Sequence, residues 1–409
     1  MEEWRKYKLK DFIEFNPKEK VPQGELCRKI SMDQITPFTR FVESNIYEVY
    51  KGGAKFRNYD TIMARITPCL ENGKTAYISS LHPEEVAVGS TEYIVLRKRE
   101  NISDSKFIFY LAISPIVRDI AIKSMVGSSG RQRVQQDVLE NYEIPIPSLP
   151  MQKNIAHILS VLDDKIELNK RINDNLEQQA QALFKSWFVD FEPFKEGKFV
   201  DSELGMIPES WRVCSAETIF KINIGKTPPR KEQQWFSNIN NGNVKWISIS
   251  DLGSNEIFIE DSKEYLTKEA ISKFNIIVVP KDTILVSFKL TVGRVGISNC
   301  ELTTNEAVAR FYLPKSYFRE YTYLSLKNYN YARLGSTSSI ATAVNSKIIK
   351  NMKLLIPPAT IISEFSKRVN PLFNAIRIYE NEIRNLSKIR NTLLPKLMSG
   401  ELKINDINN

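Results

Sequence analysis

The side chains of this chain that could carry out catalysis are few and far apart in the sequence. Histidine occurs only at His82 and His157, and His157 lies in a segment with the periodicity of a long helix. A Ser-His-Asp or Cys-His arrangement would therefore depend on His82, whose neighbours show no pattern typical of such a site. The Gly-Lys-Thr run at Gly225 lacks the earlier glycine of a phosphate-binding loop, because that position holds Phe220.

Metal and cofactor chemistry is equally weakly represented. The 4 cysteines form no Cys-x-x-Cys pair, which argues against a zinc site and is typical of reduced intracellular thiols. The sequence contains no Asn-Pro-Pro-aromatic motif of adenine methylation and no glycine-rich dinucleotide turn. Carboxylates and lysines after Asp190 (DFEPFKEGK) are spaced loosely as in a nuclease centre, but their segment has the composition of a linker. We therefore expect no catalytic residue, no metal site, no cofactor and no enzymatic activity of the chain by itself.

The charge balance instead favours an anionic partner. The 409 residues carry a formal net charge of +9, which is compatible with nucleic acid but does not identify it. The N-terminus lacks the apolar core of a signal peptide, and no apolar run approaches the ~18 residues that span a bilayer. We expect a soluble cytoplasmic protein without membrane contact, and its length predicts two or more domains.

Two long segments, which start at Pro150 and Pro358, repeat one pattern of apolar residues in a constant register. One such segment could be an ordinary surface helix, but two matched copies with a period of about 3.5 residues favour the seam of a coiled coil. Asn169 and Asn173 interrupt the seam, where they either set its register or mark a place at which the helices separate. The predicted seam residues are Ile155, Leu159, Leu162, Ile166, Leu176, Leu183 and Trp187 in the first segment, and Phe365, Val369, Leu372, Ile376, Leu386, Leu393 and Leu397 in the second.

The regions that precede the two helices also correspond to each other. Similar runs open at Trp4 and Trp211, and the run DTIMAR at Asp60 is answered by DTILVS at Asp282. Both regions mix short β-rich runs with turns and short helical stretches, which predicts α/β (α+β) domains with small, partly antiparallel sheets. The expected division is a first globular domain at 1–147, a central spacer helix at 148–190, a linker at 191–210, a second globular domain at 211–357, a C-terminal spacer helix at 358–400 and a tail at 401–409.

The order domain, helix, domain, helix constrains how the helices pair. A helix of about 40 residues is about 60 Å long, so the second domain should lie at the far end of the first helix. The second helix then meets the first by running back along it, because a parallel pair would need an almost fully extended linker. We expect an intramolecular antiparallel coiled coil that separates two globular domains, with pseudo-twofold symmetry.

In combination these motifs resemble the DNA specificity subunit of type I restriction-modification systems over essentially the whole chain. The similar motifs are the helix start at Ile144 (IPIPSLPMQKNIAHILSVLDDKI), the helix exit at Ala182 (ALFKSWFVDFEPF) and the run GMIPESW at Gly205. One departure is Ile362, which replaces the helix-start glutamine Gln152 in the second copy and puts a polar contact there in doubt. The resemblance implies two target recognition domains that read an asymmetric bipartite DNA target, and recruitment of two methyltransferase (modification) subunits and of restriction motor subunits.

Contacts with double-stranded DNA are expected from basic and amide side chains beside glycine or amide turns, where a loop can enter a groove. Arg and Lys can contact guanine edges or phosphates, and Asn or Gln can read adenine. The turn VGSSGRQR at Val126 is the most suitable, whereas GKTPPRK at Gly225 is either such a loop or a structural turn. The candidates are Lys51, Lys55, Arg57, Lys74, Arg131, Gln132 and Arg133 in the first domain, and Lys226, Arg230, Lys231, Lys289, Arg294 and Arg333 in the second.

Two other functions are compatible with the same features. A non-catalytic coiled-coil scaffold that binds proteins would leave no footprint on DNA. A self-contained nuclease or methyltransferase with an unrecognised site would show metal-dependent or methyl-donor-dependent turnover by the chain alone.

Overall fold

The computed structural model describes residues 4–128, 130–253, 256–334 and 344–403, without the side chain of Arg333. The chain divides into two compact units, of which unit 1 comprises Met1–Asn169 and Glu382–Asn409 and unit 2 comprises Lys170–Asn381. The long helices α5 (Leu149–Phe188) and α10 (Ala359–Ser399) each contribute one half to either unit.

The α/β domain of unit 1 is built on short sheets. One 4-stranded sheet has the order β2-β9-β6-β7, a second has the order β4-β3-β8-β5, and β1 pairs with β10. All neighbours are antiparallel except β3 and β8, which are parallel. The strands are β1 (Arg5–Lys8), β2 (Ile13–Phe15), β3 (Leu26–Ile30), β4 (Tyr47–Val49), β5 (Lys55–Phe56), β6 (Thr61–Ala64), β7 (Thr75–Tyr77), β8 (Ala87–Gly89), β9 (Tyr93–Lys98) and β10 (Glu143–Ile146). The helices of the domain are α1 (Leu9–Phe12), α2 (Ser105–Ile113), α3 (Pro115–Lys123) and α4 (Gln136–Asn141).

Unit 2 repeats this order of elements. A 5-stranded sheet has the order β14-β22-β19-β20-β17, a 4-stranded sheet has the order β15-β18-β16-β21, and β13 pairs with β23. The parallel pair β3–β8 of unit 1 has its counterpart in the parallel pair β16–β21. The strands are β11 (Phe199–Val200), β12 (Ile207–Pro208), β13 (Arg212–Ser215), β14 (Lys221–Ile224), β15 (Phe236–Ser237), β16 (Val244–Ile247), β17 (Phe258–Ile259), β18 (Tyr265–Leu266), β19 (Ile284–Ser287), β20 (Val295–Ser298), β21 (Thr303–Thr304), β22 (Val308–Tyr312) and β23 (Lys353–Ile356). The helices are α6 (Ala216–Ile219), α7 (Lys268–Lys273), α8 (Arg319–Lys327) and α9 (Ser346–Lys350).

Helix α2 shows why these sequences fold as they do. The side chain of Asp104 caps the helix by accepting a hydrogen bond from the Phe107 amide at 2.9 Å. The run from Phe107 to Ala112 is buried without interruption. A helix with apolar residues on all sides must lie inside its domain, and α2 packs against β6, β7, β9 and α3.

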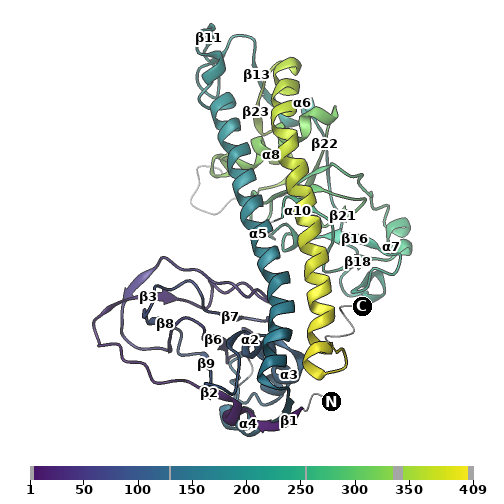
Figure 1. Cartoon of the computed structure of the whole chain (residues 1–409). Helices are drawn as coiled ribbons and strands as arrows, with labels where there is room; N and C mark the ends of the chain where they lie inside the picture. The colour runs from purple at the N-terminus through teal and green to yellow at the C-terminus, as the bar shows by residue number, and fades with distance from the viewer. Residues whose placement is uncertain (1–3, 129, 254–255, 335–343, 404–409) are drawn as a thin grey trace. The chain divides into compact units, whose positions relative to one another are not determined.

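Within each unit, α5 and α10 lie side by side and run in opposite directions (Figure 1). In unit 1 the Asp163 carboxylate accepts a hydrogen bond from Arg390 at 2.6 Å. In unit 2 the rings of Trp187 and Phe365 lie 5.7 Å apart. Early residues of α5 thus meet late residues of α10, and late residues of α5 meet early ones of α10. The predicted fold class, α/β domains with an antiparallel pair of long helices, is confirmed.

Asn169 supports the register of the helix pair. Its side chain is fully buried, and its amide donates a hydrogen bond to the Glu382 carboxylate at 2.9 Å. A buried polar group that finds its partner in only one alignment penalises slippage of the two helices. The register-setting interpretation of this residue is therefore the one that the contact favours.

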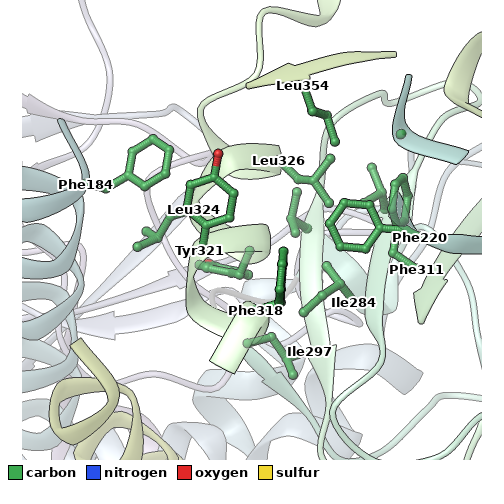
Figure 2. Packing of buried hydrophobic residues seen from close by; sticks show 14 of the residues in the cluster. Phe184, Phe220, Ile284, Ile297, Phe311, Phe318, Tyr321, Leu324, Leu326 and Leu354 are labelled. Atoms are coloured by element: carbon green, nitrogen blue, oxygen red, sulfur yellow. The ribbon is translucent and has the colours of Figure 1, made fainter. Parts of the chain in front are cut away.

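The predicted seam positions are all buried or partly buried, but many of them also belong to the cores of the α/β domains. Ile155 and Leu159 pack together with Leu397 in the core of unit 1. In unit 2, Figure 2 shows Tyr321 and Leu324 of α8 beside Phe184 of α5. Because the apolar stripe of each helix is wider than a seam, the helices are integral parts of the domain cores.

The start of α5 is fixed by Gln152, which is 1% exposed. Its side-chain oxygen accepts from the Asp104 amide at 3.0 Å, and its nitrogen donates to the carbonyls of Ile102 and Pro147 at 3.1 and 2.9 Å. Ile362, the counterpart in α10, is buried in the apolar core of unit 2. The departure seen in the sequence therefore exchanges a hydrogen-bonded anchor for an apolar one.

The segment between α5 and β13 carries its own short elements. It contains a 3-10 turn at Glu192–Phe194 and the hairpin β11–β12. The rings of Phe191 and Phe194 lie 5.4 and 5.1 Å from Trp211. Aromatic packing thus holds the start of this segment against the second α/β domain.

Candidate nucleic-acid interface

Two loops of unit 1 are joined by backbone hydrogen bonds: the connection between β6 and β7 (residues 65–74) and the turn that precedes α4 (residues 126–133). The Thr67 amide donates to the Gln132 carbonyl at 3.0 Å, and the Gln132 amide donates to the Thr67 hydroxyl at 3.0 Å. The Val134 amide donates to the carbonyl of Arg65 at 2.8 Å. The turn that the sequence favoured for groove contact is therefore hydrogen-bonded to the loop that follows β6.

Arg131 and Arg133 of this turn have different surroundings. Arg133 makes a bidentate ion pair with Glu92, with N–O distances of 2.6 to 3.0 Å. Hydrogen bonding from Arg133 lowers the pKa of the Glu92 carboxyl below its usual value. Arg131 is exposed, and among the described residues its side chain has no hydrogen-bond or ion-pair partner. Arg133 thus anchors the turn, whereas Arg131 is available to a ligand.

Two further candidates of unit 1 lie near Glu19. The Lys55 ammonium donates to the Glu19 carbonyl at 3.1 Å, and Arg57 lies 3.4 Å from the Glu19 carboxylate. Lys51 is exposed beside a Gly-Gly turn. The Lys74 ammonium donates to the Met32 carbonyl at 2.5 Å.

In unit 2, Lys226 and Arg230 are held by contacts inside the domain. The Lys226 ammonium donates to the carbonyls of Phe274 and Asn275, at the C-terminal end of α7, at 3.2 and 3.3 Å. This contact favours the structural-turn interpretation of GKTPPRK. Arg230 pairs with both carboxylate oxygens of Glu264 at 2.8 and 2.9 Å. Its guanidinium also lies 4.5 Å from the centres of the rings of Phe236 and Trp246.

The other candidates of unit 2 differ in exposure. Lys231 and Lys289 are exposed, and Lys289 lies 5.9 Å from the ring of Phe288. Arg294 is partly buried and donates to the Ile249 carbonyl at 2.8 Å. The side chain of Arg333 lies outside the described residues.

The structure also places two residues beside these candidates that the sequence did not single out. Arg65 opens the β6–β7 loop, next to the turn with Arg131, and Leu290 stands in the equivalent loop of unit 2 between β19 and β20. Arg65 is the last residue of the DTIMAR run, where the second copy has Ser287, so comparison of the two copies could have found it. Nothing in the sequence distinguishes Leu290 from a core leucine.

The described residues contain few clusters of side chains that could carry out catalysis or bind a metal ion. Both histidines are exposed, His82 in a loop and His157 on α5. Within the described residues no group of three or more His, Cys, Asp or Glu side chains could hold a metal ion. The same residues include no helix that is both long and apolar enough to cross a bilayer.

Comparison with known proteins gives a consistent picture. Residues 1–178 and 208–388 match the family described as the type I restriction modification DNA specificity domain. Over 313 residues the chain is 31% identical to the MjaIX type I restriction enzyme specificity subunit of Methanocaldococcus jannaschii, and the match covers 74% of this chain and 70% of that relative. Over 405 residues it is 25% identical to the HindI specificity subunit of Haemophilus influenzae, with 84% and 86% covered.

A solved structure has the same fold. The type I restriction-modification S subunit from M. genitalium superposes with a TM-score of 0.56 at 16% identity, and the alignment covers 97% of this chain and 96% of that one. At this identity the likeness concerns the fold and not the residues that contact DNA.

Proposed function

Because the chain belongs to the family of type I restriction-modification DNA specificity subunits, we propose that it reads an asymmetric, bipartite target in double-stranded DNA, one half-site with each α/β domain. It does so in the cytoplasm, in complex with two methyltransferase (modification) subunits, which methylate the DNA, and with restriction motor subunits, which act on unmodified DNA. Recognition of DNA sequence is the task of the family, and the arrangement in two half-sites is the part that we propose.

The observation that carries the proposal is that one scaffold occurs twice with different loops. The equivalent connections β6–β7 and β19–β20 leave equivalent strands, but the first reads RITPCLENGK and the second reads FKLTVGR. Loops on a constant scaffold are where binding specificity varies. Two different loop sets on two copies of a domain favour two different half-sites, and hence an asymmetric target.

In the first domain, the turn at residues 126–133 is the segment best supported as a contact with bases. Arg131 can contact a guanine edge or a phosphate, and Gln132 can read adenine. The hydrogen bonds to Thr67 hold the backbone of Gln132 in place before DNA arrives, so less conformational entropy is lost at this residue on binding. The net charge of +9 predicts that affinity falls steeply with salt concentration.

The test is to reconstitute the chain with its modification subunit and to map the methylated bases in DNA from cells that carry both. We expect one interrupted target with two different halves. In gel shifts at moderate salt, a duplex with this target should bind much more tightly than a scrambled duplex. Equal binding of all duplexes would refute sequence reading and would favour the scaffold function.

A variant of this turn tests the assignment of one half-site to each domain. Replacement of residues 128–132 by glycine and serine removes Arg131 and Gln132 but keeps the anchor Arg133. The variant complex should lose selectivity in one half of the target and keep it in the other. Loss of selectivity in both halves would contradict the division of labour between the domains.

A further inference from the structure

The loop between β19 and β20 presents a leucine to solvent in an unusual way. Leu290 is 98% exposed, which is the highest value among the large apolar side chains of the described residues. Its φ angle is +58°, in the left-handed region that costs an ordinary L-residue about 1 kcal/mol or more. Neither the exposure nor the backbone conformation stabilises the part of the second domain that the structure describes.

The backbone of the loop is hydrogen-bonded to Ser287, whose side chain is fully buried. The Ser287 hydroxyl donates to the Thr291 carbonyl at 2.6 Å and accepts from the Arg294 amide at 3.0 Å. The Gly293 amide donates to the Ser287 carbonyl at 2.9 Å. These bonds close the backbone of the loop on both sides of Leu290.

Tyr331 supports the other flank of the loop. Gly293 has a φ angle of +89°, and a Cβ atom there would lie 2.7 Å from the Tyr331 ring. The Tyr331 hydroxyl in turn donates to the Leu326 carbonyl at the end of α8 at 2.8 Å. Only glycine allows this close approach, and the approach ties the loop to a helix of the domain core.

The equivalent loop of the first domain is hydrogen-bonded to Gln132, the neighbour of Arg131 in the chain. Both loops connect the second and third strands of equivalent antiparallel runs, β9-β6-β7 and β22-β19-β20. Leu290 therefore lies in the loop of the second domain that is equivalent to the β6–β7 loop. In the first domain, the β6–β7 loop lies beside the turn that we propose to contact bases. The exposed Lys289 next to Leu290 suits a surface that approaches phosphates.

We propose that Leu290 is a specificity-determining residue that contacts the C5-methyl group of a thymine in the major groove of the half-site read by the second domain. A leucine side chain makes no hydrogen bonds, and the thymine methyl is the apolar group that base pairs present in this groove. The contact is selective because a leucine cannot satisfy the hydrogen-bonding groups of another base edge, and the hydrogen-bonded backbone of the loop keeps the residue at this place. This inference rests on the proposed function.

The test compares Leu290→Asn with the native chain in the complete complex with the modification subunit. Asn adopts the left-handed conformation readily, and almost no burial is lost, so the melting temperature should stay the same or rise. Affinity for the mapped target should fall about five- to tenfold, as expected for one lost apolar contact, and affinity for scrambled DNA should not change. Met206→Asn, a change at an exposed apolar residue in the β11–β12 connection, is the matched control and should leave both affinities unchanged.

Duplexes with single thymine-to-uracil replacements identify the partner base, because uracil lacks only the methyl group. One position in the second half-site should weaken binding of the native complex about as much as Leu290→Asn does, and should add nothing in the variant. The inference would be overturned if Leu290→Asn distinguished the mapped target from scrambled DNA as well as the native chain does. It would also be overturned if the loss of affinity matched no single thymine-to-uracil replacement, or if the variant no longer assembled with the modification subunit. If the native complex fails to discriminate between sequences, the proposed function itself is wrong.

Discussion

At the scale of single residues, the structure separates basic side chains that the sequence treats alike. Arg133, Lys226 and Arg230 are engaged by carboxylates or carbonyls of their own domain, whereas Arg131, Lys51 and Lys231, which are equally exposed, have no such partner among the described residues. A side chain that already has a partner must lose it before it can contact DNA, so the three side chains without a partner are the better source of DNA contacts.

The two arginines of one turn provide the sharpest comparison. Arg131→Ala should lower the affinity of the complex for its target by about tenfold and leave the melting temperature unchanged, because Arg131 has no partner among the described residues. Arg133→Ala should instead lower the melting temperature, because it releases Glu92 and loosens the turn. DNA titrations and thermal melts of both variants check this. The opposite pattern would mean that Arg133, and not Arg131, contacts DNA.

The Arg133–Glu92 pair also predicts a dependence of stability on pH. Because Arg133 lowers the pKa of Glu92 in the folded state, the pair contributes stability above the ordinary pKa of a glutamate. This contribution is lost as the pH falls through the lowered pKa. Urea unfolding of the native chain and of Arg133→Gln should therefore give curves that differ at neutral pH and converge in acid. A difference that persists in acid would show that Arg133 stabilises the turn by packing alone.

At the scale of elements, a buried polar cluster joins α5, α10 and the first domain. The Asp163 carboxylate accepts from Arg390 on α10 and from the Tyr110 hydroxyl on α2, each at 2.6 Å. Burial and the nearby Asp163 carboxylate raise the pKa of Tyr110. Arg390 stands at a seam position where an apolar residue is expected, and Asp163 is the reason that it can be buried there.

Removal of one member of this cluster should be costly. Arg390→Met leaves the Asp163 carboxylate buried without its cation, which should reduce the free energy of unfolding by about 3 kcal/mol. The double variant Asp163→Asn, Arg390→Met removes the charge as well and should recover more than half of the loss. Urea denaturation of the single and double variants measures this coupling. Equal losses in the two variants would show that the unpaired charge of Asp163 is not the cause of the loss.

At the scale of the whole molecule, α5 and α10 join the two units, because the division between units falls at Asn169 in one helix and at Asn381 in the other. The hydrogen bond between Asn169 and Glu382 shows that these two places face each other in the antiparallel pair. On the proposed function, in which each domain reads one half-site, we expect the number of residues in the two helices to set the gap between the half-sites.

Lengthening both helices at this place tests that idea. Insertion of seven residues after Asn169 and seven after Asn381 keeps the phase of the seam and adds about 10 Å. The unread gap of the target should grow by about three base pairs at roughly 3.4 Å each, with both half-sites unchanged. Mapping of methylated bases measures the gap, and insertion into α5 alone, which breaks the pairing, is the control. An unchanged gap would refute helix length as the determinant.

The sequence alone identified the family and the fold class, and both predictions are confirmed. The prediction of a non-catalytic subunit is also confirmed, by the relatives, which are named as specificity subunits of type I restriction enzymes. These properties can be predicted from a sequence because they depend on local patterns, such as the period of the long helices and the repeated motifs before them.

Only the tertiary structure decided which side chains are available to a partner. Arg131 and Arg133 have the same chemistry and stand two positions apart, but Glu92, far away in the sequence, engages only Arg133. Leu290 would count as a core residue on composition, yet the bonds around Ser287 present it to solvent. The partner of a side chain is set by chain segments that folding brings together, and that information is absent from any local stretch of sequence.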